Sequence, residues 1–202
     1  MVRIAAGSGR TRRKDYPEKR RAILRAAAAA FRERGVQNTG MRDIAARAGI
    51  STASLYYYFE GKDHLLAFCQ ETALERMLAA VAEARREAAD PPEALRRVVF
   101  AQLRCTLGEV DGASAHLEVD ALPPALRRRV VAQRDRYERA VRALVQDGMD
   151  RGAFRPGDAT LITRAILGAL NWTNRWVRPD GPLDGDRIAA VFADYLVRGL
   201  LP

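Results

Sequence analysis

Apolar residues recur every three or four positions through most of the chain, the spacing that places them on one face of an α-helix. The longest such patterns run from Lys62 to about Ala89 and from Pro124 to about Arg151. Asp90-Pro91-Pro92 ends the first of them, because proline cannot continue a helix and favours the start of the next one. We therefore predict an all-α fold with about nine helices.

Prolines, glycines and capping residues set the limits of the other predicted helices. Pro17 is expected to begin the first helix, where a missing N–H costs little, and Gly35 is expected to end it. Asp158 is expected to cap a helix that runs to about Arg178. The remaining helices are predicted over residues 41–48, 52–58 and 92–107, around residues 113–119, and around residues 188–196.

Residues 39–59, TGMRDIAARAGISTASLYYYF, have the pattern of two short helices that cross at a tight turn. Gly49 stands at the turn and can adopt a backbone conformation that residues with a Cβ resist. Ala45 is small enough for a close crossing, and Ser51 can cap the second helix with its side-chain oxygen. This is the pattern of a DNA-reading helix-turn-helix. The residues spaced to be buried between the two helices are Ile44, Ala45, Ala48, Ile50, Leu55 and Tyr58.

The net charge of +9 belongs to the segment that holds this motif. Residues 1–62 contain 14 lysines and arginines and 5 acidic residues, whereas residues 63–202 contain 20 of each kind. A basic segment attached to a neutral body fits binding to nucleic-acid phosphates, because neutralising them releases counterions. A solvated basic tail is the alternative. Residues 1–15, rich in Gly, Ser and Arg, are expected to form a flexible basic arm.

The sequence argues against several other classes of protein. It contains no apolar run of about 18 residues and no apolar segment of signal-peptide length near its start, so we expect a cytoplasmic protein that does not contact a membrane. Cys69 and Cys105 lack a metal-type spacing and are expected to be buried thiols. Common catalytic motifs, phosphate-binding glycine loops and paired Cys/His sets are absent. We therefore expect no enzyme activity, no catalytic residue, no cofactor and no metal.

The helix-turn-helix resembles that of the TetR family of bacterial transcriptional regulators over about residues 18–66. The resemblance implies a three-helix DNA-binding domain at residues 16–62 and a helical ligand-binding and dimerisation domain at residues 63–202. It also implies a homodimer whose two symmetric heads read a palindromic operator. The resemblance depends on RDIAARAGISTASLYYYF, on Phe59, Lys62, Leu65 and Leu66 after it, and on a helix before it that ends with Phe31 and Gly35.

The outward face of the second helix of the motif is expected to enter the major groove, because its short side chains allow a close approach to the bases. The resemblance implies that Arg42 contacts guanine or phosphate and that Tyr56 and Tyr57 hold the DNA backbone or the edge of a sugar. Lys62 begins the next helix, where its charge and the free N–H groups favour a phosphate. The expected DNA contacts are Arg42, Thr52, Ala53, Ser54, Tyr56, Tyr57 and Lys62.

The last two predicted helices carry more apolar surface than one core needs, which suggests a dimer built as a four-helix bundle. Trp172 and Trp176 lie one turn apart on the first of these helices, beside Asn171 and Arg175. These four residues are expected either to line a pocket for a hydrophobic effector or to pack in the dimer interface. The segment NWTNRWVRPDG is similar to family members that sense acyl-CoA thioesters of fatty-acid and steroid breakdown.

We therefore predict a dimeric repressor that a small hydrophobic effector releases from its operator, with an acyl-CoA thioester as the candidate effector. One alternative is a helical partner-binding protein that no longer recognises DNA. The other is an enzyme with a helical catalytic domain. The basic excess argues against the first alternative, and the missing catalytic motifs argue against the second.

Overall fold

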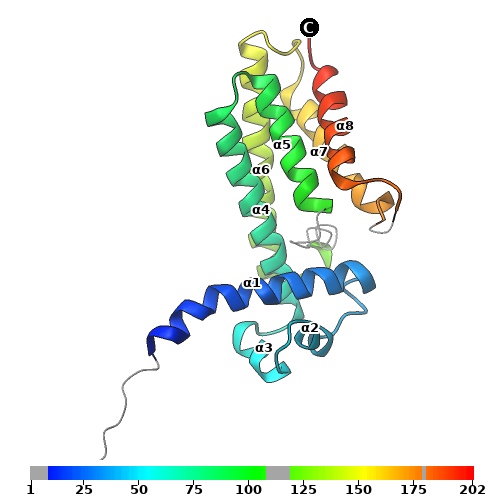
Figure 1. Ribbon diagram of the computed structural model, residues 1–202. Helices are drawn as coiled ribbons and strands as arrows, with labels where there is room; N and C mark the ends of the chain where they lie inside the picture. The colour runs from blue at the N-terminus through cyan, green and yellow to red at the C-terminus, as the bar shows by residue number, and fades with distance from the viewer. Residues whose placement is uncertain (1–8, 108–118, 179–180) are drawn as a thin grey trace, which may run out of the picture.

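The computed structural model describes residues 9–107, 119–178 and 181–202, and the regular structure within these ranges is entirely helical (Figure 1). The predicted all-α fold is thus confirmed. The described helices are α1 (Gly9–Arg34), α2 (Met41–Arg47), α3 (Thr52–Tyr58), α4 (Lys62–Glu87), α5 (Pro91–Leu107), α6 (Pro124–Asp150), α7 (Ala159–Trp176) and α8 (Gly185–Arg198), with one 3-10 turn, η2 (Val119–Ala121).

Most helix limits agree with the capping and breaking residues. α6 begins at Pro124, as predicted, and α4 ends close to the expected position, before the prolines that start α5. Asp158 caps α7, because its Oδ1 accepts hydrogen bonds from the backbone N–H groups of Thr160 at 2.8 Å and Leu161 at 3.1 Å. The helix expected around residues 113–119 lies almost entirely outside the described residues, which resume with η2.

The first helix begins earlier than the sequence pattern indicated. α1 starts at Gly9, so the prediction that Pro17 begins it is wrong, and residues 9–15 of the expected arm are helical. The residues before Pro17 are rich in arginine, which favours helix, and a proline inside a helix removes one hydrogen bond and bends the axis without ending it. Figure 1 shows α1 bent along its length. Residues 1–8 lie outside the described ranges.

The helices form a head and a body that share α4 (Figure 1). α1, α2 and α3 make the head at one end of α4. α5 and α6 pack along the rest of α4, α7 packs on α6 and α8 packs on α5, with the C-terminus at the far end of the body. Buried side chains form one continuous cluster from Ile23 in α1, through Leu65 in α4, to Val197 in α8. In the described part of the chain, no helix combines the length and the apolar character needed to cross a membrane.

One face of α7 and α8 is apolar and exposed. On the inner side, α7 buries Ile166 and Leu170, and α8 buries Ile188 and Ala189. The outer side therefore does not contribute to the core of this chain. It carries Leu161, Trp172, Trp176, Val191 and Tyr195, which are between 41% and 80% exposed.

The turn between α6 and α7 is packed without spare space. Phe154 is 1% exposed, and its ring occupies the position that a Cβ on Gly148 would take. Gly152 turns the chain with a φ of +69°, a conformation that favours glycine. The N–H of Arg155 then donates to the carbonyl of Leu200 at 2.8 Å, which holds the turn against the C-terminal segment.

Gly148→Ala should lower the free energy of unfolding by about 1–3 kcal/mol, because the new methyl group forces the buried Phe154 ring to move. Urea unfolding followed by circular dichroism measures this difference. The control is Gly61→Ala, since a Cβ at Gly61 meets nothing within 4 Å and the φ of 178° is extended backbone. Equal stability of the two variants would contradict the packing described for this turn.

Candidate nucleic-acid interface and internal cavity

The turn between α2 and α3 has the geometry expected of a helix-turn-helix. Gly49 adopts a φ of +66°, and the next N–H, from Ile50, donates to the carbonyl of Ala45 at 3.0 Å. Ser51 caps α3, because its Oγ accepts a hydrogen bond from the N–H of Ser54 at 3.1 Å. Ile44, Ala45 and Leu55 are buried between the helices, and Ala48, Ile50 and Tyr58 are partly buried. The predicted turn, cap and buried face are confirmed.

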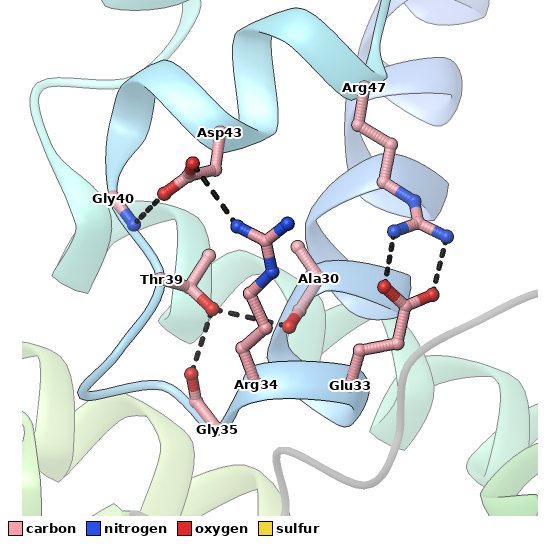
Figure 2. A network of polar contacts seen from close by, with 8 residues as sticks. All are labelled: Ala30, Glu33, Arg34, Gly35, Thr39, Gly40, Asp43 and Arg47. Carbon is pink, nitrogen blue, oxygen red and sulfur yellow. Dashed lines mark hydrogen bonds and ion pairs between the residues drawn. The ribbon is translucent and has the colours of Figure 1, made fainter.

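Two ion pairs hold α2 against the end of α1 (Figure 2). Both guanidinium NH groups of Arg47 lie 2.6 Å from the carboxylate oxygens of Glu33. Arg34 lies 3.3 Å from Asp43 Oδ1, while Asp43 Oδ2 accepts a hydrogen bond from the N–H of Gly40 at 2.9 Å. Asp43 therefore caps its own helix and pairs with α1 at the same time. The two pairs connect α2 to α1 on the exposed side of the head, where such pairs add little to stability.

Thr39 connects the end of α1 to the start of α2 from the buried side (Figure 2). It is 1% exposed, and its hydroxyl lies 2.8 Å from the carbonyl of Gly35 and 3.2 Å from that of Ala30. The last carbonyl groups of a helix lack partners within the helix, so a side-chain donor here satisfies one of them. Gly35 itself turns the chain with a φ of +76°.

The predicted base-reading and backbone-holding residues lie on the outer side of the head. Tyr56 and Tyr57 are 52% and 78% exposed, Ala53 and Ser54 are exposed, and Thr52 is partly buried. The short side chains of Ala53 and Ser54 allow α3 to approach a groove closely, and the exposed tyrosines lie beside them.

Arg42 differs from Arg34 and Arg47 in its contacts. It is exposed on α2 and has no hydrogen-bond or ion-pair partner among the described residues, whereas Arg34 and Arg47 each pair with a carboxylate. A guanidinium with no internal partner can bind a guanine or a phosphate without breaking an existing pair. Its predicted role as a DNA contact is therefore compatible with its position.

Lys62 has a structural partner that the sequence did not indicate. Its Nζ donates to the carbonyl of Val36 at 2.9 Å, so the first residue of α4 is tied to the loop that follows α1. The ammonium group has three donors, so this bond still leaves donors for a phosphate. The predicted DNA contact by Lys62 stays a prediction.

A second set of contacts joins the head to the body near the start of α6. Both carboxylate oxygens of Glu71 lie within 3.0 Å of Arg129, which ties α4 to α6. Close by, the guanidinium of Arg20 lies 4.3 Å from the ring centre of Phe68 and 5.3 Å from that of Phe59. Cation–π contacts of this kind stabilise the packing of α1 on α4.

The body contains a cavity of about 340 Å³ between α4, α5, α6 and α7, which is partly open to solvent, since Val131 in its lining is 37% exposed. This volume lies near the lower end of the range found for small-molecule sites. Its apolar lining comes from four residues, Leu74, Met77, Val131 and Leu167. The polar lining residues are Gln102, Arg134, Asp135, Tyr137, Glu138 and Asn171. Such a cavity suits a mostly apolar ligand that also carries a polar group.

A chain of hydrogen bonds crosses the buried side of this cavity. The hydroxyl of Tyr137 donates to Gln102 Oε1 at 2.8 Å, and Gln102 Nε2 donates to Asn171 Oδ1 at 3.2 Å. Gln102 is 3% exposed and Tyr137 is 5% exposed. Burial, with a further contribution from the nearby Cys105, raises the pKa of Tyr137, so its phenol remains protonated and can donate. Three helices are thus joined by neutral polar groups.

Burial also lowers the pKa of Arg134, although the charge of Asp120 partly opposes this effect. The side of the cavity formed by α6 therefore places one guanidinium among the carboxylates of Asp135 and Glu138. Glu138 pairs with Arg142 at 3.7 Å. The charged lining is balanced within the protein and holds no excess of positive charge.

The four predicted ligand residues do not lie together. Asn171 lines the cavity, whereas Trp172 is 65% exposed and Trp176 is 41% exposed on the outer face of α7. Arg175 is exposed on the same helix, and the Trp176 ring lies 6.3 Å from that of Phe192. Sequence reasoning missed Gln102 and Tyr137. A polar residue within the apolar stripe of an amphipathic helix was the available signal for both.

The two cysteines are free thiols. Burial raises the pKa of Cys69 to about 12 and also raises the pKa of Cys105, where the charge of Arg76 opposes the shift. Thiols with a raised pKa are poor nucleophiles at neutral pH. Among the described residues, no group of three or more His, Cys, Asp or Glu side chains is arranged to hold a metal ion.

Two family sequence models match the chain. One, described as bacterial regulatory proteins of the tetR family, matches residues 23–68, and the other, described as the tetracyclin repressor-like C-terminal domain, matches residues 88–200. The HTH-type transcriptional repressor KstR2 of Mycobacterium tuberculosis is 28% identical over 183 residues, which cover 88% of this chain and 90% of that protein.

Solved structures of regulators are also similar over most of their length. The TetR family transcriptional regulator PfmR from Thermus thermophilus has a TM-score of 0.78 and 38% identity, with 89% of this chain and 99% of that chain covered. AibR in complex with isovaleryl coenzyme A and operator DNA has a TM-score of 0.76 and 27% identity, with 91% and 98% covered.

Thr39→Val should lower the free energy of unfolding by about 1–2 kcal/mol, because it keeps the shape of the side chain and removes the hydroxyl that satisfies the carbonyl of Gly35. Chemical unfolding measures the change. Thr39→Ser retains the donor and is the matched control, expected to lose less. A valine variant as stable as the wild type would show that the hydroxyl does not hold the end of α1.

Proposed function

Because the chain belongs to the TetR family of bacterial transcriptional regulators, we propose that it is a ligand-responsive repressor that binds a palindromic operator as a dimer. It acts in the cytoplasm, where the DNA is. The observation that carries the proposal is the head, in which two ion pairs and a buried core hold the helix-turn-helix, while Tyr56, Tyr57 and Arg42 remain exposed. The basic excess of residues 1–62 supplies the attraction to phosphates.

The dimer forms through the exposed apolar face of α7 and α8. Trp172 and Tyr195, at 65% and 80% exposure, are the kind of large aromatic side chains that dominate interface energies. Gly168 and Ala165, on the same face of α7, allow two helices to approach closely. A two-fold axis through this four-helix bundle places two heads at half-sites about 34 Å apart, one turn of the DNA helix.

The effector is a small hydrophobic molecule that enters the cavity between α4 and α7, and we propose an acyl-CoA thioester. The apolar lining suits an acyl chain, and Asn171 is the predicted ligand residue that lies there. The operator-bound AibR complex contains isovaleryl coenzyme A, which supports this class of effector for a similar fold. Trp172 and Trp176 then belong to the dimer interface, the second of the two roles considered for them.

Effector binding changes DNA affinity through α4. Leu74 and Met77 of α4 line the cavity, and the same helix begins at Lys62, which is bonded to the head. The Glu71–Arg129 pair joins this helix to α6, another wall of the cavity. A shift of α4 relative to α6 thus changes the spacing of the two heads. A tenfold loss of operator affinity requires about 1.4 kcal/mol of preference for the DNA-free arrangement.

The proposal is tested by a gel shift on the DNA that flanks the gene of this protein, with and without isovaleryl-CoA, octanoyl-CoA and the corresponding free acids. Retention of one palindromic fragment that a thioester releases and its acid does not would support both the repressor and the effector class. Retention that no thioester relieves would leave the regulator and remove the effector class. A failure to retain any fragment, including a random library of inverted repeats, would contradict DNA recognition.

Arg42→Ala should weaken binding to the retained fragment about 10–100-fold, because it removes a guanidinium that has no other partner among the described residues. Fluorescence anisotropy measures the affinity, and circular dichroism checks that the helix content is unchanged. Arg136→Ala, which removes an exposed arginine from the body, is the control and should bind normally. Equal affinity of both variants would remove Arg42 from the DNA contacts.

Replacing Trp172 and Tyr195 together with alanine should convert the dimer to a monomer at micromolar concentration, because buried aromatics of an interface contribute about 2 kcal/mol or more each. Sedimentation velocity measures the change. Tyr57→Ala removes a tyrosine of similar exposure from the head and should leave the dimer intact. If the double variant still sediments as a dimer, the subunits meet elsewhere.

A further inference from the structure

The hydrogen-bond chain across the cavity has a defined direction. Tyr137 donates to Gln102 Oε1, so the Gln102 amide must direct its Nε2 donor to Asn171. Asn171 uses its oxygen to accept that bond, and its Nδ2 has no hydrogen-bond partner among the described residues. The hydrogen-bond chain therefore ends at the cavity with a donor, the Nδ2 of Asn171. A ligand that satisfies it must bring an acceptor.

The surroundings of this donor select the kind of acceptor. Gln102 and Tyr137 are neutral and buried, and the charged lining residues are one guanidinium, of Arg134, and two carboxylates, of Asp135 and Glu138. A carboxylate would find the one guanidinium of the lining already among carboxylates, so the desolvation of this anion would not be offset. A carbonyl oxygen accepts the same hydrogen bond without bringing a charge.

We propose that Asn171 determines specificity by donating from Nδ2 to a carbonyl oxygen of the effector, and that Tyr137 and Gln102 hold its amide in the orientation that makes this possible. This rests on the cavity being the effector site of the repressor. The apolar residues Leu74, Met77 and Leu167 then contact the hydrocarbon part of the molecule and set its size. The group of the effector that meets Asn171 is thus an uncharged carbonyl, as in a thioester, an ester or a ketone.

The experiment compares two probes that differ only at the carbonyl group. Octanoyl-CoA has a thioester carbonyl, whereas octyl-CoA is the thioether with the same chain and the same coenzyme, and a thioether sulfur is a weak acceptor. Isothermal titration of the full-length dimer should give a dissociation constant about tenfold lower for octanoyl-CoA, the difference expected for one hydrogen bond. Equal affinities, including no binding of either probe, would overturn the inference.

Substitutions at Asn171 separate recognition from packing. Asn171→Leu removes the donor and should bring the ratio of the two constants to about one, and Asn171→Asp, which still accepts from Gln102, should favour octyl-CoA. Leu167→Ala is the control, because the loss of an apolar contact should weaken both probes and leave their ratio unchanged. A tenfold preference that survives in both Asn171 variants would show that this amide does not read the carbonyl.

Operator retention by the same samples keeps the two proposals distinguishable. Variants that still bind the operator and lose the preference for octanoyl-CoA support the role of Asn171 in an intact repressor. Operator binding together with equal affinity of the wild type for both probes overturns the specificity inference alone. If the wild type does not bind the operator, the proposed function itself is overturned.

Discussion

The arrangement of this protein depends on α4, which belongs to two packing units at once. Its first turns bury Leu65 and Leu66 beside the head, and its later turns bury Leu74 and Met77 within the body. The buried cluster is continuous along the helix, so the head cannot rotate freely about a linker. Interiors packed in this way transmit displacements instead of absorbing them, and a movement in the body therefore reaches the head.

Some arginines around the helix-turn-helix make internal contacts, whereas Arg42 makes none among the described residues, and their positions in the sequence do not distinguish the two kinds. Arg34 and Arg47 pair with carboxylates of neighbouring segments and give the head its geometry. Arg20 lies on aromatic rings beside α4. Arg42 has no such internal partner in the described part of the chain, and its charge is directed to solvent. The positive potential of the head and its rigidity thus come from the same residue type.

The sequence was most informative where the constraints are local. Gly49 and Ser51 act on their immediate neighbours, so the turn and the cap of α3 could be predicted from them. Pro17 was misleading because a proline only prefers the first turn of a helix, and the residues before it favour helix. The DNA contacts and the domain limits inferred from the sequence stay predictions.

The cavity could not be predicted from the sequence, because it is assembled from distant positions. Gln102 lies 35 residues from Tyr137 and 69 residues from Asn171 in the chain, and only the packing of three helices brings their side chains together. The tryptophans drew attention by their rarity and size, yet they lie on the outer surface of the helix that carries Asn171. Which side of an amphipathic helix faces a ligand and which faces a partner is decided by neighbours that a single sequence does not identify.

Different residues of the cavity lining act on the length of a bound molecule and on its functional group. The apolar side chains of the lining come from α4, α6 and α7 and can be exchanged one at a time for larger or smaller ones. The polar chain is different, because altering one of its three members leaves a buried partner unsatisfied. Single substitutions of the apolar lining can therefore change the length of the molecule that is accommodated, whereas a substitution that changes the preferred functional group also disturbs a buried hydrogen bond.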